Sequence, residues 1–399
     1  MTAGSAAPSR LSGTNLERTA DHNQRVTLPA IRVSGACTRN ELAEITGLTA
    51  PTVANITRRL LDDGLIETTG KVHGPRGQPA IRFAVRSDAC FSIGVCVDRD
   101  DVSMVLIDFA GETLARRSST IAAATPGQIQ AYYRGSVGGL LRSAGVAPDR
   151  ILGVGVALPD DPDARATRSG GAAAWDGIDV QALFAAPFGR PVFTHTPVAA
   201  AALGEMQLGL GQRHDNFFYI LIGATLGGGL IVDGNFVGQA NGRGADLAAI
   251  AGPPHASAKT IEASVSRPGL VRHLETHGFG IDDISADAAA CTRVWIARAA
   301  EQLIPALIAI NGLLNPAILL VGGLPEQVLD GLVEQASDRL RFTGAMLPAT
   351  APIARAALAP DSAAVGAAIL PIRHHFLPKP GTLWKAPTLR ERERRESIL

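Results

Sequence analysis

The sequence predicts an α/β protein in which a small N-terminal helical unit precedes a body of two similar lobes. Helical periodicity runs in short segments from His22 to Leu61, and apolar strands alternate with helices from about residue 88 onward. Residues 91–114 and 217–238 resemble each other, because each contains an apolar strand, a short turn, a second apolar strand and a turn with glycine. This duplicated hairpin predicts two lobes, each with its own sheet.

Composition limits the class of protein. Of the 399 residues, 46% are hydrophobic and 19% are charged, which is enough to build large cores. The 37 basic and 37 acidic residues exclude a uniformly basic nucleic-acid coat. The four cysteines lack CxxC spacing, the N-terminus lacks an apolar signal core, and prolines and asparagines interrupt the most apolar stretch, 304–323. We therefore expect a soluble cytoplasmic protein with no membrane partner.

The N-terminal unit reads as two short helices joined by a glycine turn. Residues 38–41 (TRNE) form a capping box, Leu42 and Ile45 share one face of the helix that follows, and Gly47 ends it. Pro51 is tolerated in the first turn of a second helix, in which apolar residues recur at 53, 56 and 60. This arrangement is typical of a helix-turn-helix.

The polar face of the second helix indicates DNA binding. Asn can read adenine and Arg can read guanine or hold phosphate, and both residue types lie off the apolar stripe. Residues 65–68 and 80–85 predict a two-stranded wing with a basic tip at 73–78. The alternative is an ordinary helical hairpin with a solvated polar face. The expected DNA-binding residues are Thr38, Arg39, Thr49, Thr52, Asn55, Arg58, Arg59, Arg76 and Gln78.

The remaining elements fill the two lobes. Strands are expected at 151–158 and 317–323, and helices at 129–144 and 198–208. A long Ala-rich helix is expected at 286–314, with a possible kink at Pro305.

The chain resembles the ROK family of repressors, open reading frames and sugar kinases over about residues 13 to 376. The resemblance is carried by Asn23-Gln24-Arg25, by Gly77-Gln78-Pro79 after the wing, and by Ala202-Leu203-Gly204-Glu205. It implies an N-terminal winged helix-turn-helix followed by a two-lobed actin-like ATPase fold of the sugar-kinase type. The expected parts are a disordered N-terminus (1–20), the winged helix-turn-helix (21–86), the first lobe (87–195), the second lobe with a terminal helix returning to the first (196–377), and a charged tail (378–399).

The motifs for phosphoryl transfer depart from the family pattern. The family's general-base aspartate lies eight residues before the glutamate matched by Glu205, and that position is Pro197, which cannot take a proton. His195 is two residues away and is not expected to replace it. The family's Asp-x-Gly-Gly-Thr phosphate motif falls on 96–100, where Asp98 and Asp100 would repel a triphosphate. The glycine turns at 223–229 and 321–323 fit either phosphate binding or strand packing. We expect no catalytic residue.

The zinc motif of the family is also missing. Its histidine position is Ala249, and residues 252–264 contain no cysteine, so His255 alone cannot build a tetrahedral site. We expect no metal and no cofactor. The resemblance implies that some sugar-binding chemistry survives, because acidic groups stand where the family holds sugar hydroxyls; the alternative is that these acids are only solvated. The effector candidates are Asp160, Thr196, Asp246 and Glu262, with Trp175 and Asp176 beside them.

These observations predict a transcriptional repressor, without enzymatic activity, whose kinase-like body binds an effector. Its partners would be a double-stranded DNA operator and a sugar or sugar derivative, and it would act as a homodimer or homotetramer. The alternatives are an ATP-dependent sugar kinase and a regulator controlled by a protein partner. Residues 1–85 carry 10 basic and 7 acidic residues and 379–399 carry 6 and 3, whereas 86–378 carry 21 and 27. The N-terminal unit is therefore basic and the two-lobed body acidic. Because DNA phosphates repel an acidic body, we expect the N-terminal unit to make the contact with DNA.

Overall fold

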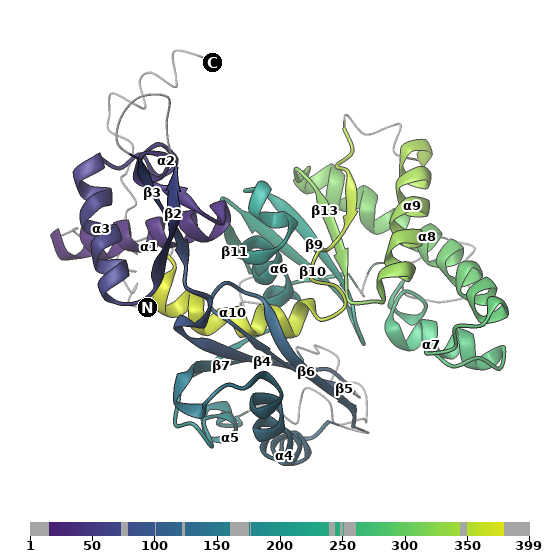
Figure 1. The fold of residues 1–399 in the computed structure, drawn as a ribbon. Helices are drawn as coiled ribbons and strands as arrows, with labels where there is room; N and C mark the ends of the chain where they lie inside the picture. Colours follow the sequence, from purple (N-terminus) through teal and green to yellow (C-terminus); the bar gives the residue numbers. More distant parts are fainter. Residues whose placement is uncertain are drawn as a thin grey trace, which may run out of the picture. The chain divides into compact units, whose positions relative to one another are not determined.

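The computed structural model describes residues 16–72, 79–99, 101–121, 124–159, 175, 177–238, 244–247, 250, 261–343 and 349–378. The chain divides into two compact units (Figure 1). We call Met1–Arg86 with Arg373–Leu399 the head, and Ser87–Ile372 the body. The predicted fold class, a winged helix-turn-helix followed by a two-lobed α/β body, is confirmed.

The head combines helices with a small antiparallel sheet of order β1-β3-β2. Its elements are α1 (Leu16–Ser34), β1 (Cys37–Thr38), α2 (Arg39–Thr46), α3 (Ala50–Asp62), β2 (Ile66–Val72) and β3 (Ala80–Val85). Ile31, Leu42 and Phe83 are buried in its core. The predicted partner of Leu42 on the face of α2, Ile45, is instead 58% exposed, because the short helix buries a single narrow stripe.

The body contains two sheets with the same topology, which confirms the predicted duplication. Their orders are β6-β5-β4-β7-β8 and β11-β10-β9-β13-β14. In each sheet, the strand that comes first along the chain (β4 or β9) pairs antiparallel with the next strand (β5 or β10). It also pairs parallel with a strand that follows a helical connection (β7 or β13). The strands are β4 (Phe91–Val97), β5 (Asp101–Ile107), β6 (Thr113–Thr120), β7 (Ile151–Ala157), β8 (Val192–His195), β9 (Phe217–Ile222), β10 (Leu226–Val232), β11 (Asn235–Val237), β12 (Ala245–Asp246), β13 (Leu319–Gly322) and β14 (Ile353–Arg355).

Helices cover both faces of each sheet. The first sheet buries one face against α4 and α5, and the second buries one face against α7, α8 and α9 (Figure 1). The helices are α4 (Pro126–Ala144), α5 (Val180–Phe184), α6 (Pro197–Leu208), α7 (Arg267–Thr276), α8 (Ala286–Leu314, with Pro305 inside), α9 (Glu326–Thr343) and α10 (Ser362–Phe376), with 3₁₀ turns η1 (Ser87–Ala89), η2 (Pro148–Arg150), η5 (Leu210–Arg213) and η6 (Ile261–Ala263). Among the described residues, no helix is both long and apolar enough to cross a membrane.

Helix α10 packs against the first sheet and against α6. A Cβ added at Gly155 of β7 would lie 1.8 Å from the carbonyl oxygen of Ala367 in α10. A Cβ added at Gly366 of α10 would lie 1.8 Å from the carbonyl oxygen of Ala200 in α6. Glycine therefore lets backbones meet where any side chain would separate them. The last residues of α10, from Arg373, belong to the head.

Candidate nucleic-acid interface and phosphate turns

Helix α2 begins at the predicted capping box. The Thr38 hydroxyl accepts a hydrogen bond from the Glu41 amide at 3.3 Å, and the Glu41 carboxylate accepts one from the Thr38 amide at 2.7 Å. These contacts lower the pKa of Glu41, because they favour its charged form. Gly47 ends the helix with a φ of 67°, in the left-handed region that glycine adopts without strain.

Two of the predicted DNA-binding residues have partners inside the head. Thr38 is buried and caps α2. The Arg39 guanidinium donates a hydrogen bond from Nε to the Thr57 hydroxyl at 2.9 Å and lies over the Phe83 ring, 5.0 Å from its centroid. Both side chains thus help to position α2 and α3, and their contact with DNA stays a prediction.

Thr38→Ala is expected to lower the free energy of opening of α2 by about 1 kcal/mol, because it removes the cap. Thr49→Ala is the matched control: Thr49 is the N-cap of α3 but makes no side-chain cap hydrogen bond, and its hydroxyl meets only that of Thr52, at 2.9 Å. Hydrogen exchange of the α2 amides in the full chain measures the difference. Equal effects of the two substitutions would mean that the capping box contributes nothing.

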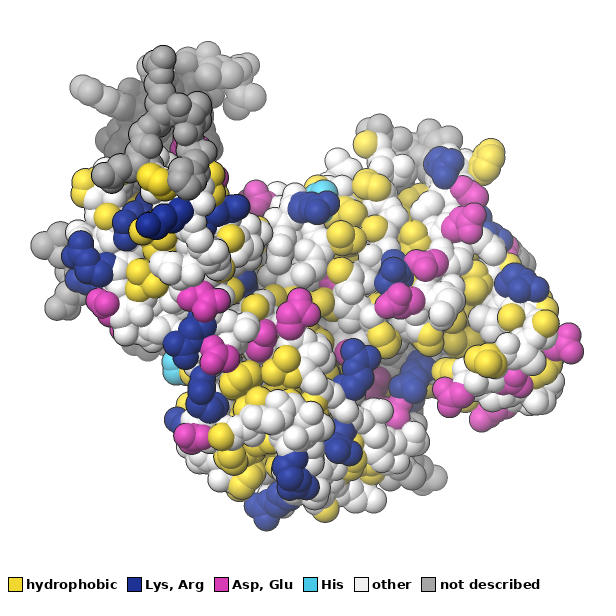
Figure 2. Space-filling model, viewed as in Figure 1, with side chains coloured by type: hydrophobic (Ala, Val, Ile, Leu, Met, Phe, Trp, Pro, Cys, Tyr) yellow, Lys and Arg dark blue, Asp and Glu magenta, His cyan; other side chains and the backbone are white. Residues whose placement is uncertain are grey.

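Helix α3 separates a buried stripe from a polar face. Val53, Ile56 and Leu60 pack into the head, which confirms the predicted apolar repeat. The polar face carries the predicted residues Asn55, Arg58 and Arg59, all exposed, and the half-buried Thr52. Asn55 and Arg58 are three residues apart and so share a face of the helix. Figure 2 shows Lys and Arg side chains over α3 and over the sheet of the head.

The wing is formed by β2 and β3. They pair antiparallel, with a register shift between Thr68 and Gly70, and β2 is longer than the predicted 65–68. The Arg82 guanidinium donates a hydrogen bond to the carbonyl oxygen of Ala36, which ties β3 to the segment before α2. The predicted tip residues Arg76 and Gln78 lie outside the described residues.

Arg25 has a role that sequence reasoning missed. Its Nη1 donates hydrogen bonds to the carbonyl oxygens of His374 and Leu377, at 3.1 Å each, and its Nε pairs with Asp21 at 2.8 Å. The last carbonyls of a helix have no partner within the helix, so Arg25 caps the end of α10. The sequence offered Arg25 only as part of the Asn23-Gln24-Arg25 pattern.

The two turns that the resemblance matches to phosphate-binding turns are joined by acidic residues of the first lobe. The Asp98 carboxylate, between β4 and β5, accepts a hydrogen bond from the amide of Ala224, in the turn between β9 and β10, at 2.9 Å. Next to it, the Arg267 guanidinium at the start of α7 forms an ion pair with Asp101, and the Arg267 amide donates to the Gly223 carbonyl oxygen at 2.9 Å. An amide that could bind a phosphate oxygen is thus occupied by a carboxylate of the chain.

Asp98 makes this contact sensitive to pH. Burial raises the pKa of Asp98, while hydrogen bonds from Ala224 and Arg99 and the charge of Arg267 oppose that rise, and the charge of Asp101 adds to it. The folded state therefore binds a proton more readily than the unfolded state, so the contribution of Asp98 to stability falls as pH rises above the ordinary pKa of an aspartate.

Asp98→Asn is expected to remove this part of the pH dependence. Urea unfolding between about pH 4 and pH 8 should show wild-type stability falling relative to that of the variant as pH rises, because the amide does not titrate. Since other groups titrate alike in both proteins, the difference between their free energies of unfolding at each pH reports the titration of Asp98. Parallel curves would contradict the assignment.

The position that the resemblance matches to a general base, Pro197, lies at the start of α6. Pro197 is its first residue and Thr196 its N-cap. The Thr196 amide donates a hydrogen bond to Nδ1 of His195 at 3.0 Å. The His195 ring packs edge-on against the Phe236 ring, with 5.2 Å between the two ring centroids. Among the described residues, the Thr196 hydroxyl is buried and has no hydrogen-bond partner. A buried hydroxyl without a partner is costly unless a ligand or water satisfies it.

Two of the predicted acidic residues, Asp246 and Glu262, lie in the second lobe. Asp246 is exposed on β12 and pairs through the backbone with Gly227, and a Cβ at Gly227 would lie 3.3 Å from Cβ of Val198, two residues after Thr196. Thr196 and Asp246 therefore lie on neighbouring segments. Glu262 is half-buried in η6, and Asp160 lies outside the described residues. The predicted neighbour Trp175 is buried, and its indole N–H has no partner among the described residues, whereas Asp176 is not described.

Glu205, the last residue of the ALGE segment, is structural. It is fully buried, and its carboxylate accepts hydrogen bonds from the amides of Leu358 at 2.7 Å and Leu210 at 3.1 Å. Burial raises the pKa of Glu205, and these hydrogen bonds oppose the rise. The side chain ties α6 to η5 and to the segment between β14 and α10.

Both units of the chain match models of known protein families. Residues 92–374 match the profile of the ROK family, and residues 21–67 match a winged helix-turn-helix DNA-binding domain. An uncharacterized protein of Sinorhizobium fredii, y4fQ, is 30% identical over 89% of this chain and 91% of its own length. The xylose repressor of Bacillus subtilis is 23% identical over 53% of this chain and 55% of its own length, so the match spans about half of that repressor.

Solved structures share the fold. A ROK family transcriptional regulator described as a homologue of the Escherichia coli MLC protein aligns with a TM-score of 0.64 at 19% identity, over 90% of this chain and 97% of that one. A ROK family glucokinase from Streptomyces griseus, in complex with glucose and AMPPNP, aligns with a TM-score of 0.57 at 23% identity, over 70% of this chain and 98% of that one. Regulators and kinases therefore share the architecture of the body.

Proposed function

The chain belongs to the ROK family, and from this premise we propose that it is a sequence-specific DNA-binding transcriptional repressor that acts in the cytoplasm. The observation that carries the proposal is the polar face of α3. Asn55, Arg58 and Arg59 are exposed on a helix whose other face is buried, and its partner α2 begins at a complete capping box. This is how a recognition helix is presented to the major groove.

The body is proposed to carry out no phosphoryl transfer. The resemblance matches Pro197, the first residue of α6, to the general base of the family's kinases, and proline has no group that accepts a proton. The Ala224 amide in the second phosphate turn is taken by Asp98, and a fixed carboxylate there repels a triphosphate. Because kinases share this fold, a coupled assay is the test: we expect no sugar-dependent ATP turnover. Turnover that responds to sugar would favour the kinase alternative instead.

The effector is proposed to be a small sugar or sugar derivative bound near the start of α6. The unpartnered hydroxyl of Thr196 and the carboxylate of Asp246, on a neighbouring segment, offer a donor and acceptors of the kind that hold sugar hydroxyls. The related Bacillus subtilis protein is named for xylose, which makes pentoses a first choice for a screen. We expect calorimetry to detect a sugar whose binding Thr196→Val weakens at least about tenfold, since the variant cannot hydrogen-bond.

Regulation is proposed to follow from the interlobe contacts in a homodimer or homotetramer. A dimer would place two recognition helices on a two-fold symmetric operator. An effector would change operator affinity only if it bound one arrangement of the lobes more tightly than another. If no sugar binds in calorimetry but operator binding persists, control by a protein partner becomes the better explanation.

A further inference from the structure

Three side chains of types that can ligate a metal ion lie close together between α7 and α8. His273 lies on α7, His277 directly follows its last residue, and Cys291 lies near the start of α8. One ligand atom from each lies within 4.8 Å of the others. Across the described part of the chain, this is the one such group of at least three His, Cys, Asp or Glu residues.

Helix packing brings these residues together. Leu270 and Leu274 of α7 share a core cluster with Trp295 and Ile296 of α8, and Cys291 packs at its margin. His273 follows Leu270 by three residues and His277 follows Leu274 by three, so both imidazoles extend from the edge of the apolar stripe. Cys291 precedes Trp295 by four residues and lies on the same side of α8. The ligands therefore lie along the seam of two packed helices.

Backbone carbonyls orient both imidazoles. Nε2 of His273 lies 3.2 Å from the Cys291 carbonyl oxygen, and Nδ1 of His277 lies 2.8 Å from the His273 carbonyl oxygen. A carbonyl oxygen only accepts, so each of these nitrogens carries the proton. In the neutral imidazoles, Nδ1 of His273 and Nε2 of His277 then keep lone pairs for a metal. Such a carbonyl partner is the usual support of a metal-ligating histidine.

We propose that His273, His277 and Cys291 bind a thiophilic divalent transition metal ion, with Zn²⁺ as the expected ion. Two imidazoles four residues apart and a thiolate suit Zn²⁺ or Co²⁺, whereas Mg²⁺ and Ca²⁺ prefer oxygen. Tetrahedral zinc needs ligand atoms about 3.3 to 3.7 Å apart, so atoms that lie up to 4.8 Å apart must approach each other by up to about 1.5 Å. His277 is exposed and Cys291 and His273 are half-buried, which leaves room for that adjustment and for a water as fourth ligand.

The helix end at this site also favours a cation. The C-terminus of α7 is the negative end of the helix dipole. The site shares no residue with the family's zinc motif, whose positions lie at Ala249 and in the segment that follows, so it qualifies the expectation that no metal is bound. Only weak signals of this site are present in the sequence: a His-x-x-x-His spacing at 273–277 and a cysteine too far away for any spacing rule to connect it with them.

A metal here would fix the helix that joins the lobes. Helix α7 starts with Arg267, whose side chain pairs with Asp101 of the first lobe and whose amide donates to Gly223. A metal ion bound at the other end of α7 would link this helix to α8, because its ligands come from both helices.

The test uses the full-length chain without a histidine tag, freed of metal by chelation and titrated with Co²⁺. We expect one Co²⁺ per chain, a thiolate-to-cobalt charge-transfer band, and displacement of Co²⁺ by Zn²⁺. Cys291→Ser should abolish the band, and His277→Gln should weaken Co²⁺ binding at least about tenfold. Cys90→Ser and His214→Gln are matched controls, since both residues are half-buried and outside the cluster.

Thermal unfolding gives a second measurement, because a ligand that binds only the folded state raises the Tm. Zn²⁺ should raise the Tm of the wild type and of both controls, but not that of Cys291→Ser. Absence of the charge-transfer band in the wild type would overturn the proposal. So would a band that survives in Cys291→Ser or disappears in Cys90→Ser. Circular dichroism of each variant separates loss of the ligand from loss of the fold.

Discussion

Arg58→Ala is expected to weaken operator binding by about tenfold or more, because each good base or phosphate contact of this kind contributes about 1–3 kcal/mol. Arg58 is exposed on α3, so its removal should leave the head folded. Fluorescence anisotropy with operator DNA at several salt concentrations measures the effect. If Arg58 holds a phosphate, the salt slope should also fall by about one. If Arg58 reads a guanine, the loss of affinity should depend on which base stands at one position of the operator.

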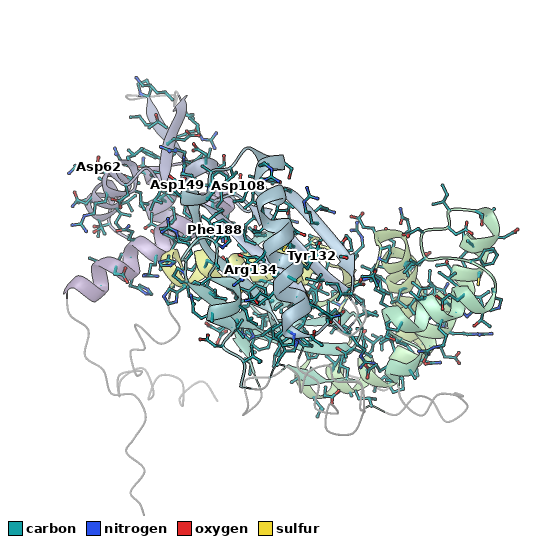
Figure 3. All side chains as sticks on the ribbon, turned by 90° about the horizontal axis from the view of Figure 1, so that it is seen from below. Asp62, Asp108, Tyr132, Arg134, Asp149 and Phe188 are labelled. Atoms are coloured by element: carbon teal, nitrogen blue, oxygen red, sulfur yellow. The ribbon has the colours of Figure 1, made fainter. Side chains whose placement is uncertain are left out.

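Arg134→Ala is the control for charge alone. Arg134, labelled in Figure 3, is exposed on α4 of the body, so this variant loses the same charge from the body and leaves the head unchanged. Its operator affinity should match that of the wild type. Asn55→Ala, on the same face of α3 as Arg58, should lose affinity too. Unchanged affinity and salt slope in Arg58→Ala would remove this residue from the interface.

Gly366→Ala is expected to lower the free energy of unfolding of the body by about 3 kcal/mol or more, because the core there is already filled. Its new Cβ would lie 1.8 Å from the Ala200 carbonyl oxygen and 2.3 Å from its carbonyl carbon, and these backbone atoms of α6 cannot rotate away. Urea unfolding followed by tryptophan fluorescence reports the change, since Trp175 and Trp295 are buried in the body.

Gly135→Ala is the matched control within a helix. Gly135 lies inside α4, and an added Cβ would meet nothing within 4 Å. Alanine favours helices over glycine, so this variant should be more stable by up to about 1 kcal/mol. Equal destabilisation by both substitutions would show that helix propensity, not the contact of α10 with α6, sets the effect.

Local patterns in the sequence predicted the elements well. The capping box depends on residues three apart, and the boundaries of α8 follow from one periodic run, so both could be predicted without tertiary information. The duplicated hairpin predicted the two sheets, because each lobe repeats the same strand pattern. Ile45 was misjudged, since the periodicity of a short helix does not say how wide a stripe its neighbours bury.

Contacts between distant residues were beyond the sequence. Asp98 was interpreted as a residue that repels phosphate, but its partner Ala224 lies 126 positions away and no spacing rule connects them. Arg25 caps the end of α10 across 349 positions. The cluster of His273, His277 and Cys291 likewise depends on how α7 packs on α8. Such contacts follow from the tertiary fold, which local propensity does not determine.

The most direct test of the account is a footprint of the full-length protein on DNA from upstream of its own gene. We expect salt-sensitive protection of two half-sites spaced by about one helical turn or a multiple of it, because paired recognition helices meet the same face of the duplex. Protection should weaken in Arg58→Ala and persist in Arg134→Ala. If the wild-type protein protects no sequence there at any salt concentration, the chain does not act through this DNA and the central claim is contradicted.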